Sequence, residues 1–321
     1  MSTKCASLVA DIGGTHARFA LVDEEGGQLR AIEVLPCRHY DHPEQAVADY
    51  LERVGEDSVG QACLAVACPV RGGRVKMTNN PWCIYPKQLQ EQFGWSACKL
   101  INDFSAMALG TIRVPEACLV HVCGGPGDPT SPRLVMGPGT GLGVGALVPT
   151  RKGWVPLATE GGHVDYAPTT ELDVEVHRLL REQFGRVSVE RILSGPGLVN
   201  LYRAQSQVQR VSVRFSTPEE ITSAALRGSD ALAMDALQHF CEILGRTAGN
   251  AVLTQGSYGG VYLCGGILPG ILDFLLNSRF RDGFEDKGRM RSLMESTPVY
   301  VVTDAYTGLR GAAEALRNDE V

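Results

Sequence analysis

Apolar residues at the start of the chain come in blocks of strand length, and further on they recur at helical spacing. Ser7–Ile12 is an almost continuous apolar run that predicts a buried strand, and Arg18–Val22 predicts a second strand after the Gly13-Gly14 turn. Pro43 opens a stretch with apolar residues at helical spacing, which predicts a helix. The other elements expected in this part are strands at 29–35, 62–70, 74–78 and up to 101, and helices near 87–93 and after 103. This order of elements predicts a mixed α/β layer.

The pattern begins again after a loop rich in glycine and proline at 124–132. Strands are predicted at 134–137, 142–148, 154–157, 260–264 and 299–303, and helices at 171–184, about 230–253, 267–276 and 307–317. Thr217-Pro218-Glu219-Glu220 has the form of a capping box with proline at the first helical position. Residues 11–22 and 137–148 both contain a glycine turn and end in Ala-Leu-Val, with four of twelve aligned positions identical. This weak repeat suggests a duplicated fold.

Charge and composition limit the classes of partner. The 321 residues carry a formal net charge of −6, which does not favour a nucleic acid or an anionic membrane surface. No window reaches the roughly 20 apolar residues that span a bilayer, and the first residues do not resemble a signal peptide. The ten cysteines include no Cys-x-x-Cys pair. We therefore expect a globular protein of the reducing cytoplasm with no membrane or nucleic-acid partner.

Two glycine turns are candidates for holding phosphate groups. In Asp11-Ile12-Gly13-Gly14-Thr15 a strand ends in a carboxylate and two glycines, which permit a positive φ and a close approach of backbone N–H groups to an anion. The carboxylate can hold Mg²⁺ through water, although an ordinary hairpin explains these residues equally well. Glycine also occupies every second position from Gly137 to Gly145. In a strand that period removes the side chains from one face, which suits close approach of a ligand, with the Thr140 hydroxyl as an additional donor.

The alternative for this second run is a flexible loop or close packing of a sheet. No lysine follows as in a Walker A loop, and the dinucleotide spacing Gly-x-Gly-x-x-Gly does not occur. A third pair, Gly265-Gly266, follows the strand at 260–264. It suits the ring or ribose of a nucleotide, or is a plain strand-to-helix turn.

Polar side chains at three places are candidates for contact with a substrate. Asp103, after a predicted strand, is a candidate general base, but Asn and Asp are also favoured helix N-caps, and an aspartate with an ordinary pKa of about 3.9 is a weak base for an alcohol. In Glu160-Gly161-Gly162-His163 the glycines let both polar side chains point into one site. Hydroxyl groups of a polyol fit this pair better than a metal does, because cysteine ligands are missing. Glu190 carries no local signal and is interpreted as a solvated surface residue.

In order and spacing these segments resemble the motifs of the sugar kinase–actin superfamily, and within it the bacterial glucokinase family. The resemblance extends over nearly the whole chain, through VADIGGTHARFALV, AVACPV, MTNNPW, INDFSA, GPGTGLGV, EGGHVDYAP, ERILSGPGLVNLYRA, GGVYLCGGILP and FRDGFEDKGRM. It implies an α/β protein with a duplicated ribonuclease H-like (actin-like ATPase) fold, in two domains with a central cleft. The implied small domain is 1–111 plus 302–321, and the large domain is 112–301. Homodimers are usual in this family.

The resemblance implies ATP-dependent phosphorylation of glucose at its 6-hydroxyl, with Mg²⁺ arriving on ATP and linked to Asp11 through water. Asp103 is the implied catalytic base, and the implied sugar contacts are Asn102, Asp103, Glu160, His163 and Glu190. The implied nucleotide contacts are Ala10, Asp11, Ile12, Gly13, Gly14, Thr15, Gly139, Thr140, Gly141, Gly265 and Gly266.

One feature of a related group is missing. No zinc-binding Cys-x-Cys-Gly follows His163 as it does in the repressor/open-reading-frame/kinase group, so we expect His163 to contact sugar and expect no metal bound by the protein alone. A kinase for another hexose and a non-catalytic, sugar-responsive regulator are the alternatives. An actin-like assembly ATPase would share the phosphate turns but has no need of the Asn-Asp pair or of the Glu-Gly-Gly-His segment.

Overall fold

The computed structural model of the protein describes residues 6–23, 27–56, 58–70, 74–77 and 80–321. Contacts within the chain divide it into two compact units. The first comprises Met1–Glu116, Leu147–Ala158 and Asp304–Val321, and the second comprises Ala117–Ala146 and Thr159–Thr303. The last segment of the chain therefore belongs with the first strands.

A five-stranded sheet forms the centre of the first unit. Its strands are β1 (Ala6–Ile12), β2 (His16–Val22), β3 (Arg30–Pro36), β4 (Val59–Val66) and β7 (Ala97–Asn102), in the order β3-β2-β1-β4-β7. The helices are α1 (Pro43–Val54), α2 (Pro86–Phe93), α3 (Asp103–Gly110) and α11 (Thr307–Arg317), and a small hairpin joins β5 (Val75–Lys76) to β6 (Cys83–Ile84). β1, β2 and β3 are antiparallel neighbours, whereas β4 and β7 run parallel to β1. Parallel neighbours need a crossover, which α1 supplies before β4 and α2 before β7.

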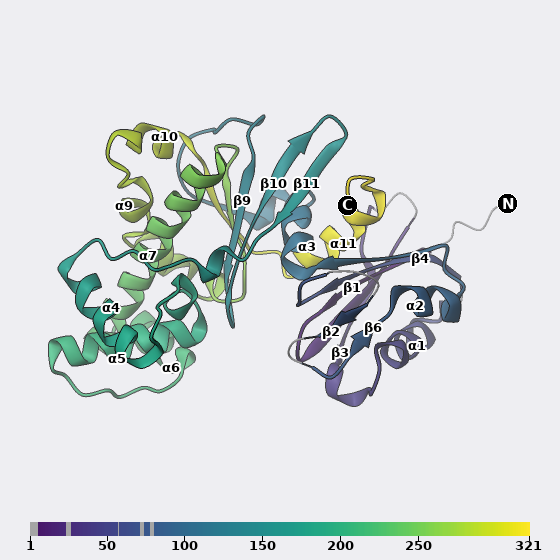
Figure 1. Ribbon diagram of the computed structural model, residues 1–321, viewed down its shortest axis with the longest axis horizontal. Helices are drawn as coiled ribbons and strands as arrows, with labels where there is room; N and C mark the ends of the chain where they lie inside the picture. Colours follow the sequence, from purple (N-terminus) through teal and green to yellow (C-terminus); the bar gives the residue numbers. More distant parts are fainter. Residues whose placement is uncertain (1–5, 24–26, 57, 71–73, 78–79) are drawn as a thin grey trace. The chain divides into compact units, whose positions relative to one another are not determined.

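The side chains of β1 alternate between the two faces of this sheet. Leu8, Ala10 and Ile12 are fully buried in one core together with residues of α1 and α2. Asp11 lies between them in sequence and therefore points to the other face, which α3 and α11 cover. Figure 1 shows α1 and α2 on one side of the sheet and α3 and α11 on the other.

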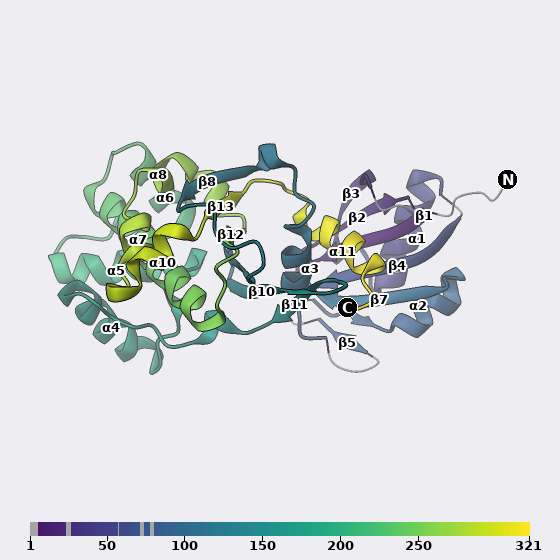
Figure 2. The ribbon, with the colours of Figure 1, turned by 90° about the horizontal axis from the view of Figure 1, so that it is seen from above.

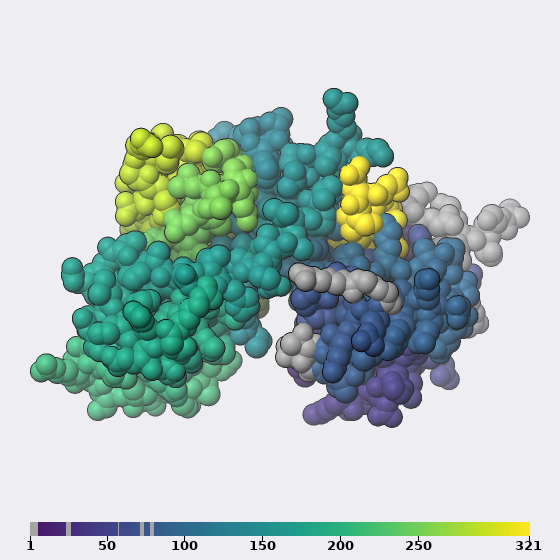
Figure 3. Space-filling view, viewed as in Figure 1, coloured from purple at the N-terminus to yellow at the C-terminus, as the bar shows by residue number. Residues whose placement is uncertain are grey.

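Lys99 on β7 fixes the last helix to the sheet. Its ammonium group donates to three backbone carbonyl oxygens, those of Ala315, Asn318 and Val321, at 2.8, 3.0 and 3.0 Å. A cation is favourable at the carboxyl end of a helix. At the other end of α11, a Cβ added to Gly308 would lie 3.1 Å from Asp11 Oδ2. The yellow C-terminal segment thus packs on blue segments of the first unit (Figure 3), and its first turn meets Asp11.

The sheet that runs through the second unit has six strands in the order β11-β10-β9-β12-β13-β8. Their bounds are β8 (Leu119–Cys123), β9 (Arg133–Pro138), β10 (Leu142–Thr150), β11 (Gly153–Ala158), β12 (Val261–Leu263) and β13 (Val299–Val302), with residues 147–158 assigned to the first unit. The helices are α4 (Glu171–Phe184), α5 (Gly195–Gln209), α6 (Pro218–Leu226), α7 (Ala231–Gln255), α8 (Leu272–Leu276), α9 (Phe280–Glu285) and α10 (Arg291–Ser296). The long α7 contacts α5, α6 and α9 and lies at the centre of the helical part (Figure 2).

A buried carboxylate, Asp173 on α4, joins several parts of the second unit. It is fully buried and accepts hydrogen bonds from the Tyr166 hydroxyl at 2.6 Å, the His239 ring at 2.6 Å and the Arg246 guanidinium. The Thr170 N–H donates to it at 2.9 Å. Burial opposes the charge, but these hydrogen bonds hold the pKa of Asp173 well below its ordinary range. The loop that contains Tyr166 and Thr170 is thereby fixed to α4 and α7.

The two sheets repeat one topology. We number the five shared strands in chain order within each sheet, starting from β1 in the first sheet and from β9 in the second. In both sheets the third, second, first, fourth and fifth of these strands lie side by side in that order, as β3-β2-β1-β4-β7 and β11-β10-β9-β12-β13. The fourth strand is parallel to the first and the fifth to the fourth in each sheet. β8 adds an antiparallel edge to the second sheet only. The duplicated α/β fold predicted from a weak repeat and from the resemblance is therefore confirmed.

Most predicted elements are present, and the differences have local reasons. The helices at 171–184 and 307–317 have the predicted bounds, and Thr217 forms the predicted capping box. The helix expected at 267–276 is divided into a 3₁₀ turn at Leu268–Ile271 and α8, because Pro269 and Gly270 interrupt it. The strand predicted at 74–78 is the short β5, and its last residue lies outside the described residues. α5 was not predicted, since its first turn, Gly195-Pro196-Gly197, resembles a loop.

None of the described helices is long and apolar enough to cross a membrane.

Candidate active site

The carboxyl ends of three parallel strands form one edge of the first sheet. Ile12 of β1 pairs with Val66 of β4, and Val66 pairs with Asn102 of β7. The strands therefore end at the same level, and the Gly13 turn and Asp103 that follow them lie at the same edge. Ligands of open α/β sheets bind at this edge. Within the first unit, the structure thus brings together the predicted phosphate turn and the predicted base.

Backbone hydrogen bonds hold the turn between β1 and β2. The Gly13 N–H donates to the His16 carbonyl at 2.9 Å, and the Cys37 N–H donates to the Thr15 carbonyl at 2.9 Å. Neither Gly13 nor Gly14 has a positive φ, so a left-handed backbone is not the reason for glycine, and that part of the prediction is wrong. The nearest atom to a Cβ at Gly13 would be the His16 carbonyl oxygen at 3.5 Å. Close approach of a ligand at these glycines stays a prediction.

Asn102 is the N-cap of α3. Its Oδ1 accepts from the N–H groups of Phe104 at 3.0 Å and Ser105 at 3.2 Å. Its Nδ2 donates to the Cys68 carbonyl at 3.3 Å and to Asp103 Oδ1 at 3.0 Å. An amide side chain has two donor hydrogens and two acceptor lone pairs, so these four bonds use its full capacity. The helix-cap alternative is confirmed for Asn102, and its contact with a sugar stays a prediction that requires one of these bonds to be exchanged.

Asp103 has one oxygen held by the protein. Oδ1 accepts from Asn102 and from the Phe104 N–H at 2.8 Å. Among the described residues no donor contacts Oδ2, so Oδ2 is the oxygen that can accept a proton. Burial raises the pKa of Asp103 and the charge of Asp11 raises it further, to about 6. The ordinary pKa assumed from the sequence is therefore too low, and the structural value suits a base that works near neutral pH.

Asp11 adds a second carboxylate to this edge. Burial raises its pKa, and the Arg18 guanidinium, 3.5 Å from Oδ2, acts in the opposite direction. Arg18 was not predicted as a site residue, although it pairs with Asp11 across the β1–β2 hairpin. The described residues contain no group of three or more His, Cys, Asp or Glu that could hold a metal by themselves. A single carboxylate such as Asp11 fits an Mg²⁺ ion that keeps most of its water and arrives with a nucleotide, and this contact stays a prediction.

The second glycine turn follows β9. The Gly139 N–H donates to the Gly141 carbonyl at 2.8 Å, and the Gly139 carbonyl accepts from the Gly195 N–H at the start of α5, also at 2.8 Å. A Cβ at Gly139 would have no atom within 4 Å. Backbone at this point therefore faces open space, as a phosphate contact requires.

The other glycines of the run do not line one strand face. Residues 137, 143 and 145 lie in β9 and β10, whereas 139 and 141 lie in the turn. A Cβ at Gly137 would be 3.1 Å from the Cys264 backbone, and one at Gly141 would be 2.5 Å from Glu190 Oε2. Close packing, the alternative from the sequence, thus explains these two glycines, and ligand approach remains for Gly139.

Gly265 and Gly266 follow β12, which is the parallel neighbour of β9. Gly265 has a φ of +94°, and its Cβ would be 2.5 Å from the Pro138 carbonyl oxygen. Gly266 has no atom within 4 Å of the corresponding position. Gly265 therefore serves the close packing of two strand ends, and Gly266 leaves open backbone beside the Gly139 turn. This arrangement fits the predicted nucleotide contact.

The Glu160–His163 segment contains a 3₁₀ turn that packs on β10. A Cβ at Gly162 would be 2.1 Å from the Leu142 carbonyl oxygen, so glycine is needed there for packing. Glu160 and His163 are exposed. His163 Nδ1 lies 3.9 Å from Glu190 Oε1. The structure thus brings His163 and Glu190 together, which the local sequence did not indicate.

Glu190 is held by backbone rather than left in solvent. Its Oε2 accepts from the Leu142 N–H at 2.8 Å, and its side chain is 31% exposed. The interpretation as an ordinary surface residue is wrong. A bridge between Asp165 and Ser188 and a 2.9 Å bond from the Val189 N–H to the Val164 carbonyl place its segment beside the 3₁₀ turn. This long-range pairing has no signal in the residues around position 190.

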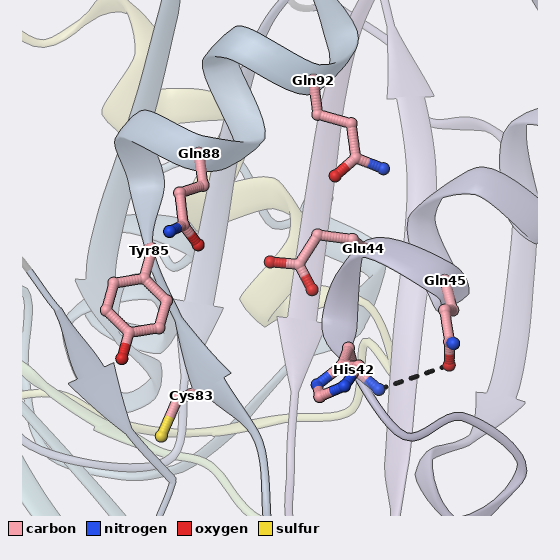
Figure 4. A pocket seen from close by; sticks show the side chains of 7 residues that line it. All are labelled: His42, Glu44, Gln45, Cys83, Tyr85, Gln88 and Gln92. Carbon is pink, nitrogen blue, oxygen red and sulfur yellow. Dashed lines mark hydrogen bonds between the residues drawn. The ribbon is translucent and has the colours of Figure 1, made fainter.

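Two concave regions of the first unit lie elsewhere. Figure 4 shows the first, which is lined by His42, Glu44, Gln45, Cys83, Tyr85, Gln88 and Gln92. The second lies between α1 and α2 and includes Leu51, Phe93 and Trp95. Neither contains a residue of the predicted site, and we assign neither to it.

Comparisons with known proteins identify the family of this chain. A family model described as Glucokinase matches residues 8–319. The chain belongs to the glucokinase family. The glucokinase of Marinobacter nauticus is 65% identical over 321 residues, and that of Hahella chejuensis is 53% identical, with 100% of each chain covered. The crystal structure of a glucokinase from an Antarctic psychrotroph has a TM-score of 0.89 and 35% identity over 98% of this chain and 99% of that one.

Membership of the glucokinase family confirms the predicted family and the predicted class of enzyme. The protein is a hexose kinase, a phosphotransferase with an alcohol as acceptor.

Proposed function

We propose that this member of the glucokinase family transfers the γ-phosphoryl group of Mg-ATP to the 6-hydroxyl of glucose, giving glucose 6-phosphate and ADP. The observation that carries the proposal is the state of Asp103. Its Oδ1 is fixed by two donors while Oδ2 is available, its pKa is about 6, and it lies at the same sheet edge as the Gly13 turn.

The proposed step uses Oδ2 of Asp103 as the proton acceptor. The 6-hydroxyl oxygen bonds to the γ-phosphorus, its proton passes to Oδ2, and the bond to the bridging oxygen breaks so that ADP leaves. The transition state of phosphoryl transfer is loose, so that positioning and electrostatics supply most of the rate. Since Asp103 Oδ1 is held by the Phe104 N–H and by Asn102, Oδ2 keeps its direction.

The backbone of the glycine turns would hold the nucleotide. Gly14 and Thr15 in the first unit and Gly139 and Thr140 in the second would donate N–H groups to phosphate oxygens, and Gly266 would flank the adenosine. Mg²⁺, as part of the substrate, would neutralise charge on the phosphates, with Asp11 holding its water. The open space at Gly139 and Gly266 supports this assignment.

The hydroxyls of the sugar would be bound by Glu160, His163 and Glu190 together with the Asn102-Asp103 pair. Sites built to hydrogen-bond a hydroxyl can reject a sugar that lacks it by roughly 10⁴. The paired position of His163 and Glu190 supports a site of this kind.

Further proposals concern the whole protein. We propose that it forms a homodimer, lies in the cytoplasm and acts in glycolysis. We also propose that its small domain comprises residues 1–111 plus 302–321 and its large domain residues 112–301.

The test is sugar-dependent ADP formation from Mg-ATP over a panel of hexoses. Glucose should be used well above fructose and the N-acetylhexosamines. Preference for another hexose would move the assignment to that sugar. ADP release that no sugar stimulates would favour an assembly ATPase, and sugar binding without turnover would favour a regulator.

A further inference from the structure

We propose that Asn80 is a positioning residue, which fixes the peptide group between Gly13 and Gly14 so that its N–H is presented to a phosphate. The inference rests on the proposed function, because it takes this turn to be a phosphate site. Asn80 contacts neither substrate in this role and acts through the backbone of the turn.

The orientation of the Asn80 amide is determined by its two partners. Its Oδ1 accepts from the Trp82 N–H at 2.9 Å, and its Nδ2 donates to the Gly13 carbonyl at 3.2 Å. Trp82 is itself buried, and its indole N–H donates to the Tyr40 carbonyl at 3.0 Å. The donor that reaches the turn is therefore attached to the core of the first unit.

The Gly13 carbonyl has a second partner. The thiol of Cys37, a buried residue, lies 3.7 Å from it and can act as a weak donor. The Cys37 N–H also donates to the Thr15 carbonyl. Two segments distant in sequence, at residues 37 and 80, thus hold the same turn from the protein side.

This arrangement sets the direction of the next N–H group. In a trans peptide the C=O and the following N–H lie in one plane and point in opposite directions. With the Gly13 carbonyl directed at Asn80 and Cys37, the Gly14 N–H points away from them. Among the described residues, neither the Gly14 N–H nor the Thr15 N–H donates to a protein acceptor. Successive amides of this kind form an anion site.

In the second glycine turn, too, a protein donor binds the carbonyl of the first glycine, but the donor is a different group. The Gly139 carbonyl is held by the Gly195 N–H at 2.8 Å, and the Gly139 N–H is used within the turn, as the Gly13 N–H is. In both turns the carbonyl of the first glycine is bound from the protein side. Donors as different as a helix N–H and an asparagine side chain serve this one atom, which indicates that its direction matters.

The experiment measures dissociation constants of ADP, adenosine and glucose by calorimetry for the natural chain and for Asn80→Ala. ADP should bind roughly tenfold more weakly to the variant, as loss of one hydrogen bond predicts. Adenosine, which has no phosphate, and glucose should bind as before. An unchanged ratio of ADP to adenosine affinity, or equal weakening of all three ligands, would overturn the inference.

Two more variants keep the test decisive. Gln61→Ala removes another side-chain amide, which donates to Ser7 at the opposite end of β1. This variant should leave the ratio of ADP affinity to adenosine affinity unchanged. A loss of ADP affinity in Gln61→Ala equal to that in Asn80→Ala would overturn the inference. If Asn80→Ala does not fold, Asn80→Asp keeps the acceptor for Trp82 but cannot donate when ionised, and an ADP affinity equal to that of the natural chain would overturn it. Because the ratio needs no turnover, this result is separate from the hexose panel that tests the proposed function.

Discussion

A methyl group at Gly141 should weaken the use of glucose, although Gly141 belongs to the turn that we assign to the nucleotide. The Cβ of Gly141→Ala would lie 2.5 Å from Glu190 Oε2 and 3.3 Å from its Cδ. The φ of Gly141 is not positive, so alanine fits the backbone and the conflict is with the carboxylate alone. Glu190 must move, and it then loses its 2.8 Å bond from the Leu142 N–H and its place beside His163.

The size of the effect follows from that hydrogen bond. A hydrogen bond to a charged group contributes about 1.5–3 kcal/mol, and 1.4 kcal/mol corresponds to a factor of ten. Because the Glu190 side chain is 31% exposed, water replaces part of the loss, and the lower end of that range applies. We therefore expect kcat/KM for glucose to fall roughly tenfold.

Initial rates of ADP formation measure this, with glucose varied at saturating Mg-ATP and Mg-ATP varied at saturating glucose. Gly139→Ala is the matched control, because its Cβ would have no atom within 4 Å. It should leave kcat/KM for glucose unchanged and raise the KM for ATP. The reasoning is refuted if Gly141→Ala uses glucose normally, or if Gly139→Ala impairs glucose use to the same extent.

Three further predictions concern carboxylates that are partly buried, as Asp11 and Asp103 are, or fully buried, as Asp173 is. Asp103→Ala should lower kcat by about 10²–10⁴, the range for a positioned base, and near-normal turnover would remove Asp103 from that role. The kcat/KM of the natural enzyme should fall as the pH drops below about 6, where Asp103 becomes protonated. In Asp11→Asn the lost negative charge should lower the pKa of Asp103, so that this fall in kcat/KM moves to lower pH. An unmoved pH profile would contradict the effect of Asp11 on the pKa of Asp103. Asp173→Ala should lower the free energy of unfolding in urea by about 3 kcal/mol, the low end of the range for a broken buried ion pair, because Arg246 loses its fully buried partner and keeps only Glu242 at 3.9 Å. Glu182→Ala, on the exposed face of the same helix, should leave the urea midpoint nearly unchanged.

Much of the fold was predictable because its signals are local. The apolar run at Ser7–Ile12, the capping box at Thr217 and the periodic helices each depend on residues close together in sequence. α5 was missed because Gly195-Pro196-Gly197 has loop composition, and it forms a helix because the Ser194 side chain caps it.

The residues of the candidate site likewise divide into those with a local sequence signal and those without one. Asp103 and the glycine turns stand at strand ends, where sequence patterns indicate them. Glu190 depends on a bridge between Asp165 and Ser188, and Arg18 depends on the register of a hairpin. The raised pKa of Asp103 depends on burial and on Asp11, which is far away in sequence. Properties that arise from long-range pairing and from desolvation were not accessible from one sequence.

Duplication explains why the glycines are similar in the two units while the reacting groups are not. Each sheet offers the same backbone turn after its first strand, with the first glycine's carbonyl held from the protein side, by Asn80 at Gly13 and by Gly195 at Gly139. Backbone geometry is a property of the fold, so it is repeated. A base needs a free carboxylate at a strand end. Asp103 follows β7 in the first sheet, and Asp304 follows the matching strand β13 in the second sheet after one intervening residue. Asp304, however, accepts from the Arg310 guanidinium at 3.0 Å and from the Thr307 hydroxyl at 3.1 Å. Of these two carboxylates, Asp103 alone keeps an oxygen that no donor among the described residues contacts, and it is therefore the one that can accept the proton.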